Sequence, residues 1–180
     1  MAENLNYKTT ASYCYNDATS NCNKYGRLYT WAAAVDSAGV WSRGALGCGF
    51  NRTCSQKSPV RGVCPEGWHL PSDDEWGTLL SAVGGSSTAS RKLMSTSGWS
   101  GPGFNNGGGS DDFGFSALPA GFRDLDGIYH NEGFETYFWS FEEFDRYEAC
   151  SKHLDFTEDS AFLDCFWTKD FGLSVRCVKD

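Results

Sequence analysis

Histidines are the residues of this sequence best suited to bind a transition metal or to act as a general base, and there are three: His69, His130 and His153. None belongs to an H-x-x-x-H or H-E-x-x-H pattern, which would place two imidazoles on one side of a helix. No G-x-S-x-G segment or phosphate-binding glycine loop occurs. The sequence therefore predicts a protein that is not an enzyme and that binds neither a metal nor another cofactor.

Carboxylates are more numerous and leave a catalytic alternative open. A pair of Asp or Glu side chains in a cleft hydrolyses glycosidic bonds, and Asp111, Asp124 and Glu142 are candidates for such a pair. Asp124 and Asp126 could also supply oxygen ligands to Ca²⁺, although the other positions of an EF-hand loop are absent and a solvated turn is the simpler interpretation. The sequence does not show which of these acids lie close together in the fold. A polysaccharide hydrolase therefore stays open as the alternative function.

Aromatic side chains crowd residues 137–147 and are interleaved with charged residues. If this segment is a strand, Tyr137, Trp139 and Phe141 share one face and Phe138 lies on the other, so that one set packs in the core while another reaches solvent. Exposed aromatic rings beside polar groups bind sugar rings or partner side chains; the alternative is that all of these rings are core. The residues that we predict to contact a ligand are Trp139, Phe141, Phe144, Arg146, Tyr147, Lys152 and His153.

Eight cysteines, an even number without C-x-x-C spacing, indicate disulfides rather than a zinc site. Three pairs are close in sequence, and the two remaining cysteines pair by exclusion. The predicted disulfides are Cys14–Cys22, Cys48–Cys54, Cys150–Cys165 and Cys64–Cys177. Buried free thiols are the alternative. Since disulfides persist in oxidising compartments, we expect a secreted or cell-surface protein.

The length and charge of the chain limit its partners. A chain of 180 residues suits one domain. The formal net charge of −8 disfavours phosphate backbones and anionic lipid, and no apolar run is long enough to span a membrane. We therefore expect no nucleic acid and no direct membrane insertion, and a glycan or a surface protein as partner. Residues 1–10 lack the features of an export signal, so we expect that it was removed or that a longer protein contains this domain.

Helices are expected mainly in the first half of the chain. A first helix of two to three turns is indicated by apolar residues spaced i, i+3, i+4 and i+7: Leu28, Trp31, Ala32 and Val35. Ser72 and Glu75 form the capping box of a second helix, which two glycines at 84–85 terminate. A weaker helical turn covers residues 90–94.

Strands follow in the second half. Residues 98–110, rich in Gly, Ser and Asn, predict a long irregular loop, and short β-type runs begin near Phe113. A Cys150–Cys165 disulfide across an antiparallel hairpin would place Lys152 opposite Leu163 and Leu154 opposite Ala161. Helices first and antiparallel strands later predict an α+β domain.

Several long segments resemble a known family. They are YCYNDATSNC, GCGFNRTC, PVRGVCPEGWHLPSDDEW, DDFGFSALPAGFRDLDG, YFWS and LSVRCVKD, and they span nearly the whole chain. They resemble the Fibrobacter succinogenes major paralogous domain, whose members are typically exported bacterial proteins. The resemblance implies that residues 1–180 form a single domain of this type, without the short strand that usually precedes the position of Met1 and without an export signal.

A more distant resemblance concerns GWHLPSDDEW and the terminal SVRC, which are similar to the "LP-E-W" and terminal patterns of C-type-lectin-like folds. It implies a C-type-lectin-like α+β fold with short helices packed on small antiparallel sheets, long irregular loops and disulfides. In such folds the chain ends lie close together and a terminal sheet displays the residues that contact the ligand.

Residues 141–169 depart from the family pattern, as expected of a segment that faces a ligand. We therefore predict a non-catalytic recognition or adhesion module that binds a glycan or a protein through the C-terminal aromatic hairpin region. A polysaccharide hydrolase and a structural envelope domain without a discrete ligand are the alternatives.

Overall fold

The main sheet combines strands from both ends of the chain. The computed structural model describes residues 1–54, 56–100, 108–156 and 161–180. Its helical elements are η1 (Tyr15–Asp17, 3-10), α1 (Thr19–Tyr25), α2 (Trp31–Ala34), α3 (Asp73–Ala82) and α4 (Ser86–Leu93). Its strands are β1 (Ser12–Tyr13), β2 (Leu28–Tyr29), β3 (Trp68–His69), β4 (Phe122–Arg123), β5 (Tyr129–His130), β6 (Glu135–Glu143), β7 (Glu148–Asp155), β8 (Ala161–Thr168), β9 (Leu173–Ser174) and β10 (Val178–Lys179). Short helices and small sheets confirm the predicted α+β class.

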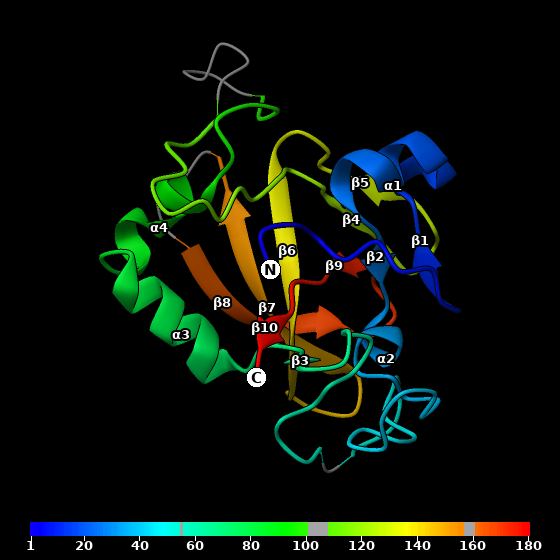
Figure 1. The fold of residues 1–180 in the computed structure, drawn as a ribbon. Helices are drawn as coiled ribbons and strands as arrows, with labels where there is room; N and C mark the ends of the chain where they lie inside the picture. The colour runs from blue at the N-terminus through cyan, green and yellow to red at the C-terminus, as the bar shows by residue number, and fades with distance from the viewer. Residues whose placement is uncertain (55, 101–107, 157–160) are drawn as a thin grey trace.

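Six strands form the main sheet in the order β1-β2-β9-β6-β7-β8. The three long strands, β6, β7 and β8, form an antiparallel meander (Figure 1). β9 pairs antiparallel with β2 but parallel with β6, so the sheet is not purely antiparallel. The hairpin register is the predicted one, with Lys152 opposite Leu163 and Leu154 opposite Ala161.

Both faces of β6 are covered. On one face Tyr137, Trp139 and Phe141 pack with α2 and with side chains from residues 45–64. On the other face Phe138 packs beside Trp76 of α3, in a cluster that α4 completes. The expectation that one set of aromatic residues reaches solvent is therefore wrong. The alternation identifies the two faces, but it does not show that a second layer covers each of them.

The helices agree only in part with the expectations. α3 begins as predicted, because the Ser72 hydroxyl accepts from Glu75 N and the Glu75 carboxylate accepts from Ser72 N. α4 extends the predicted turn at residues 90–94. The first predicted helix is reduced to the four residues of α2, because residues 28–29 form β2 and pair with β9. α1 was not predicted, since its polar sequence has no apolar periodicity.

Four disulfides connect the elements as predicted, and no cysteine is free. The two ends of the chain lie side by side (Figure 1). The Met1 amino group donates to the Cys177 carbonyl oxygen at 2.8 Å, and Leu5 N donates to the Val175 carbonyl oxygen at 2.9 Å.

Among the described residues, no helix is long and apolar enough to cross a membrane. Most of the predicted loop at 98–110 lies outside the described residues.

Candidate functional site

Three of the seven residues predicted to contact a ligand are buried: Trp139, Phe141 and Lys152. The Trp139 indole Nε1 donates to the Tyr29 carbonyl oxygen at 2.7 Å, inside the core under α2. Phe141 packs in the same core. The prediction that these residues face solvent is wrong, because layers distant in sequence cover both faces of the strands that carry them.

Lys152 lies under the start of α3 and is 3% exposed. It is opposite Phe138 on β6 and shares a face of β7 with Leu154, which packs under α3 and α4. Burial lowers the pKa of Lys152 to about 8, and the negative charge of Asp73 opposes this shift. Lys152 is therefore a buried amine with a carboxylate nearby and is not a surface contact.

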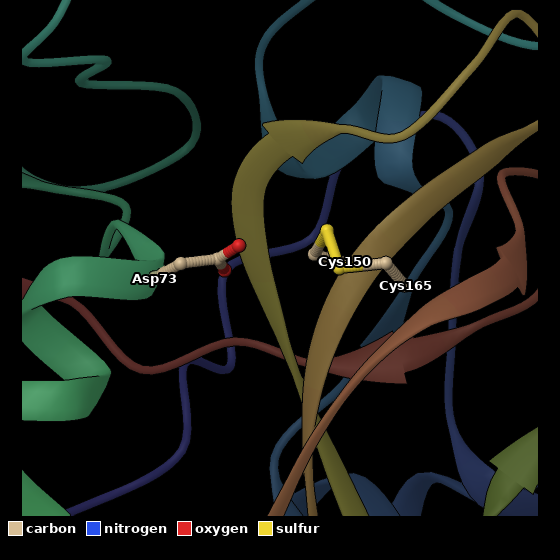
Figure 2. A group of neighbouring side chains, drawn as sticks. All are labelled: Asp73, Cys150 and Cys165. Carbon is tan, nitrogen blue, oxygen red and sulfur yellow. A yellow bond between two sulfur atoms is a disulfide. The ribbon is translucent and has the colours of Figure 1, made fainter.

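Asp73 reaches from the start of α3 toward the Cys150–Cys165 disulfide (Figure 2). A carboxylate oxygen and the two sulfurs lie within 4.8 Å of one another, a spacing that would suit a metal ion if the cysteines were thiolates. Both sulfurs are joined in a disulfide and are not thiolate ligands. This group packs α3 against the hairpin and does not form a metal centre.

Glu142, one of the candidate catalytic acids, contacts the same end of α3. Its Oε2 accepts from Asp73 N at 3.0 Å and from the Ser140 hydroxyl. Burial raises the pKa of Glu142, and the charge of Asp73 adds to the shift; burial likewise raises the pKa of Asp73. Because the first backbone N–H groups of a helix lack partners within the helix, Glu142 has a structural role as a cap.

The other two candidate acids lie in turns. Asp111 accepts from Ser116 N at 2.7 Å and from the Ser116 hydroxyl. Asp124 accepts from Ile128 N at 2.8 Å, and its second oxygen contacts His130 Nε2 at 2.7 Å. Both oxygens of each carboxylate are thus used in closing a turn.

Phe144, Arg146 and Tyr147 lie in the turn between β6 and β7, where Phe144 and Arg146 are exposed and Tyr147 is half-buried. Two further rings join them: the Phe50 centroid lies 5.3 Å from that of Tyr147, and the Phe166 centroid lies 5.2 Å from that of Phe144. The Arg146 guanidinium lies 4.6 Å from the Tyr147 ring centroid. We call these five residues the aromatic turn surface.

A buried lysine connects the two loops of this surface from beneath. Lys169 is fully buried, and its Nζ donates to the Glu143 carboxylate at 2.6 Å and to the carbonyl oxygens of Asp145 and Arg52 at 2.7 and 3.1 Å. The Glu143 carboxylate also accepts from Cys54 N at 3.1 Å. One ammonium group thus fixes the β6–β7 turn to the disulfide-closed loop at residues 48–54, so the rings are positioned before a ligand binds.

His153, the last of the seven predicted residues, is not near this surface. It lies five residues along β7 from Glu148, which is about 17 Å in an extended strand. Its half-buried ring stacks on Tyr137, with centroids 4.3 Å apart and planes inclined by 6°. The structure therefore brings together Phe144, Arg146 and Tyr147, but not His153.

A cavity of about 640 Å³ lies elsewhere, between α3 and the C-terminal segment. Its lining includes Trp76 and Phe115, and none of the seven predicted contact residues. Of its charged groups, Glu75 is bound to the α3 cap, Arg176 donates to the carbonyl oxygens of Phe115 and Ser116, the Met1 amino group donates to the Cys177 carbonyl oxygen, and Lys179 is exposed. The aromatic turn surface is the better candidate, because three of its four rings and its cation are exposed, whereas Trp76 in the cavity is buried.

The comparison with known families identifies the domain. A family model described as the Fibrobacter succinogenes major domain matches residues 1–179. The chain belongs to this family. No curated protein and no solved structure matches it.

In this Fibrobacter succinogenes major domain, sequence reasoning missed the residues that the fold brings in from other elements. Phe50 could have been found, because the short loop closed by Cys48–Cys54 must expose side chains. Phe166 lies on the edge strand β8, and an edge position is known only once the strand order is known. Lys169 gives no signal, since a lone lysine after a strand is usually exposed.

Proposed function

We propose that this domain is a non-catalytic recognition module, secreted or on the bacterial cell surface, which binds a protein ligand through the aromatic turn surface. The observation that carries this function is the exposure of aromatic rings on a turn held from beneath by Lys169. Phe166, Phe144 and Phe50 are 68%, 55% and 44% exposed. Contiguous exposed apolar groups on a soluble domain mark interaction sites.

The residue types also suit binding. Tyr and Arg dominate the energetics of protein interfaces, because each buries a large area and keeps a polar end. Side chains that are already ordered lose less conformational entropy on association. Arg146 over Tyr147, beside Phe50, is such an ordered group.

A protein ligand is favoured over a glycan. Three of the four rings are phenylalanines, which offer no hydrogen bond to a sugar hydroxyl. On β8, Phe162 and Leu163 are also 45% and 44% exposed, on opposite faces of the strand. β8 is an edge strand of the described sheet, and an edge presents backbone groups to an extended segment of a partner. Arg146 favours an acidic group beside the apolar side chains of the ligand.

The proposal includes an extracellular location and a C-type-lectin-like fold. Four disulfides and the predicted export of related proteins support an oxidising compartment. Neighbouring chain ends and the Cys64–Cys177 disulfide support a C-type-lectin-like arrangement.

The hydrolase alternative rests on Asp111, Asp124 or Glu142; the backbone N–H of Asp73 donates to Glu142, and burial raises the pKa of both carboxyl groups. The capping of α3 already accounts for the Glu142 carboxylate, so recognition remains the better-supported function. If the alternative holds, polysaccharide hydrolysis should be detectable and should be lost in Glu142→Gln.

The test is a screen of the oxidised domain against arrays of extracellular proteins and of glycans, followed by affinity measurements. For a protein ligand, we expect Tyr147→Ala and Arg146→Ala each to weaken binding by roughly tenfold or more. Both side chains lie at the surface, so the melting temperature should change little. Leu125→Ala, which alters an exposed apolar residue in the β4–β5 turn, is the matched control and should bind normally.

Two outcomes would contradict the proposed function. Unchanged affinity in both variants would place the site elsewhere, and unfolding of the variants would show that these residues are structural. Binding to glycans alone, lost in Tyr147→Ala, would keep the site and replace the class of ligand.

A further inference from the structure

The pairing of β6 with β7 brings three potential metal ligands to one face of the sheet. Glu135 is directly opposite Asp155, and Tyr137 is directly opposite His153. Since side chains two residues apart in a strand lie on the same face, His153 and Asp155 both flank Glu135. One ligand atom from each of Glu135, His153 and Asp155 lies within 4.8 Å of the other two. All three residues are half-buried, so an ion can reach them from solvent.

Neighbouring groups orient two of these side chains. The Glu135 carboxylate accepts from the Tyr137 hydroxyl and from Asn131 Nδ2, each at 2.6 Å. The His153 imidazole is held flat against the Tyr137 ring, with the planes 6° apart. Hydrogen bonds and packing of this kind orient the ligands of metal sites.

The electrostatic field at this position favours a cation. Two carboxylates directly opposite each other on neighbouring strands destabilise the pair when both are charged. A divalent ion would offset this concentration of negative charge.

We propose that Glu135, His153 and Asp155 bind one divalent transition-metal ion, with Zn²⁺ as the ion that this ligand set suits. Imidazole favours Zn²⁺ and similar ions, whereas Ca²⁺ and Mg²⁺ prefer oxygen ligands alone. Tetrahedral Zn²⁺ with bonds of about 2.1 Å places its ligands about 3.4 Å apart, so these atoms must approach by no more than about 1.4 Å. Three protein ligands leave a fourth position for water or for a group of a partner.

The site is independent of the aromatic turn surface and has its own test. The oxidised domain is dialysed against EDTA and then titrated with ZnCl₂ by calorimetry. We expect one Zn²⁺ per chain, with affinity at least tenfold weaker in His153→Gln and in Glu135→Gln. Binding should also weaken as the pH falls, because protons compete with the metal ion for its ligands. Co²⁺ in place of Zn²⁺ gives a visible spectrum that reports the coordination number.

Two further variants separate this site from adventitious binding. His130→Gln removes another half-buried imidazole beside a carboxylate, since His130 Nε2 lies 2.7 Å from Asp124, and should leave Zn²⁺ affinity unchanged. Tyr137→Phe keeps the stacked ring, removes the hydrogen bond to Glu135 and should weaken binding by roughly tenfold.

Each variant is first compared with wild type by near-ultraviolet circular dichroism in EDTA, so that loss of folding is not read as loss of a ligand. The site is refuted if Zn²⁺ does not bind, or if folded His153→Gln and Glu135→Gln bind it as wild type does. Equal weakening in His130→Gln would likewise show that Zn²⁺ binds only to surface histidines.

Discussion

Buried cations in this domain differ in how their charge is balanced. Lys169 makes a 2.6 Å ion pair with Glu143 and donates to backbone carbonyl oxygens as well. Arg176 donates to Asn4 Oδ1 and to carbonyl oxygens, and burial lowers its pKa to about 10. Burial lowers the pKa of Lys152 to about 8, with the charge of Asp73 as the opposing influence. The free energy of unfolding should therefore depend on the protonation state of Lys152.

We expect the stability of the wild type to rise relative to Lys152→Met as the pH increases from 7 to 9.5. The pKa of Lys152 is about 8 in the folded state, below the ordinary value of 10.5. Between these values the unfolded chain binds more protons than the folded one, so raising the pH favours folding. Urea unfolding of both proteins at half-unit pH intervals measures the difference.

Lys152→Met removes this titration, so subtracting its curve cancels the groups that do not interact with Lys152; Asp73, whose pKa the charge of Lys152 lowers, is the exception. The difference should be nearly constant around pH 7 and below, and should grow above pH 8. A difference that stays constant to pH 9.5 would show that the amine is solvated, and a difference that falls would show that the charged form is stabilised in the fold.

At the scale of elements, the capping box of α3 is the best example of local sequence determining local structure. Ser72 accepts from Glu75 N at 3.1 Å, and Glu75 accepts from Ser72 N at 2.9 Å. The same helix end also meets Glu142 from β6, so a local signal is reinforced by a distant strand.

Ser72→Ala should lower the free energy of unfolding by about 1 kcal/mol, because one helix N–H loses its partner. Ser81→Ala is the matched control: the hydroxyl of this exposed serine donates to the Gly77 carbonyl oxygen within α3, and its loss should cost less than about 0.5 kcal/mol. Chemical denaturation at pH 7 compares the three proteins. Equal costs for the two substitutions would contradict the capping role, and loss of ligand binding in Ser72→Ala would show that the helix end contacts the ligand.

Sequence reasoning succeeded where the information is local. The α3 cap, the hairpin register around Lys152 and Leu163, and the short disulfides all depend on residues close together in the chain. The helix predicted from Leu28 to Val35 is wrong at its start, because residues 28–29 pair with β9 although their apolar spacing is helical. Trp139 is buried, which the sequence does not show, because alternation along β6 indicates two faces but not what covers them.

The candidate sites show the same difference between residues that local sequence predicts and residues that only the fold brings together. Phe144, Arg146 and Tyr147 could be predicted, because a turn between strands exposes its residues. Lys169 could not, since its partners come from loops about 25 and 120 residues away in sequence. The cluster of Glu135, His153 and Asp155 has no motif spacing and exists only through strand pairing.

At the scale of the whole molecule, Cys64–Cys177 is the longest covalent connection, with a sequence separation of 113 residues. By the loop-entropy model, it should stabilise the fold by about 5 kcal/mol, and Cys14–Cys22, with a separation of 8 residues, by about 2.5 kcal/mol. The two bridges therefore provide a comparison within one protein.

We expect Cys64→Ala/Cys177→Ala to lose roughly twice as much unfolding free energy as Cys14→Ala/Cys22→Ala. The reason is that the longer loop restricts the unfolded chain more strongly. Urea unfolding under non-reducing conditions measures both, after peptide mapping has verified the remaining disulfides. A larger loss from the Cys14–Cys22 pair would show that native packing, and not chain entropy, sets the contribution of each bridge.

The Cys64–Cys177 bridge also determines how the domain carries tension. A pulling force applied at Met1 and Asp180 would pass along residues 1–64, across the sulfur–sulfur bond and out through residues 177–180. The intervening segment spans a sequence separation of 113, roughly 390 Å of extended chain, and would bear none of that load while the bridge is intact. That segment contains β6, β7, β8 and the turn at residues 144–147. A ligand held by the turn at residues 144–147 would thus lie on a segment outside the path of the force, whereas Phe50 of the same surface lies before Cys64 and within that path.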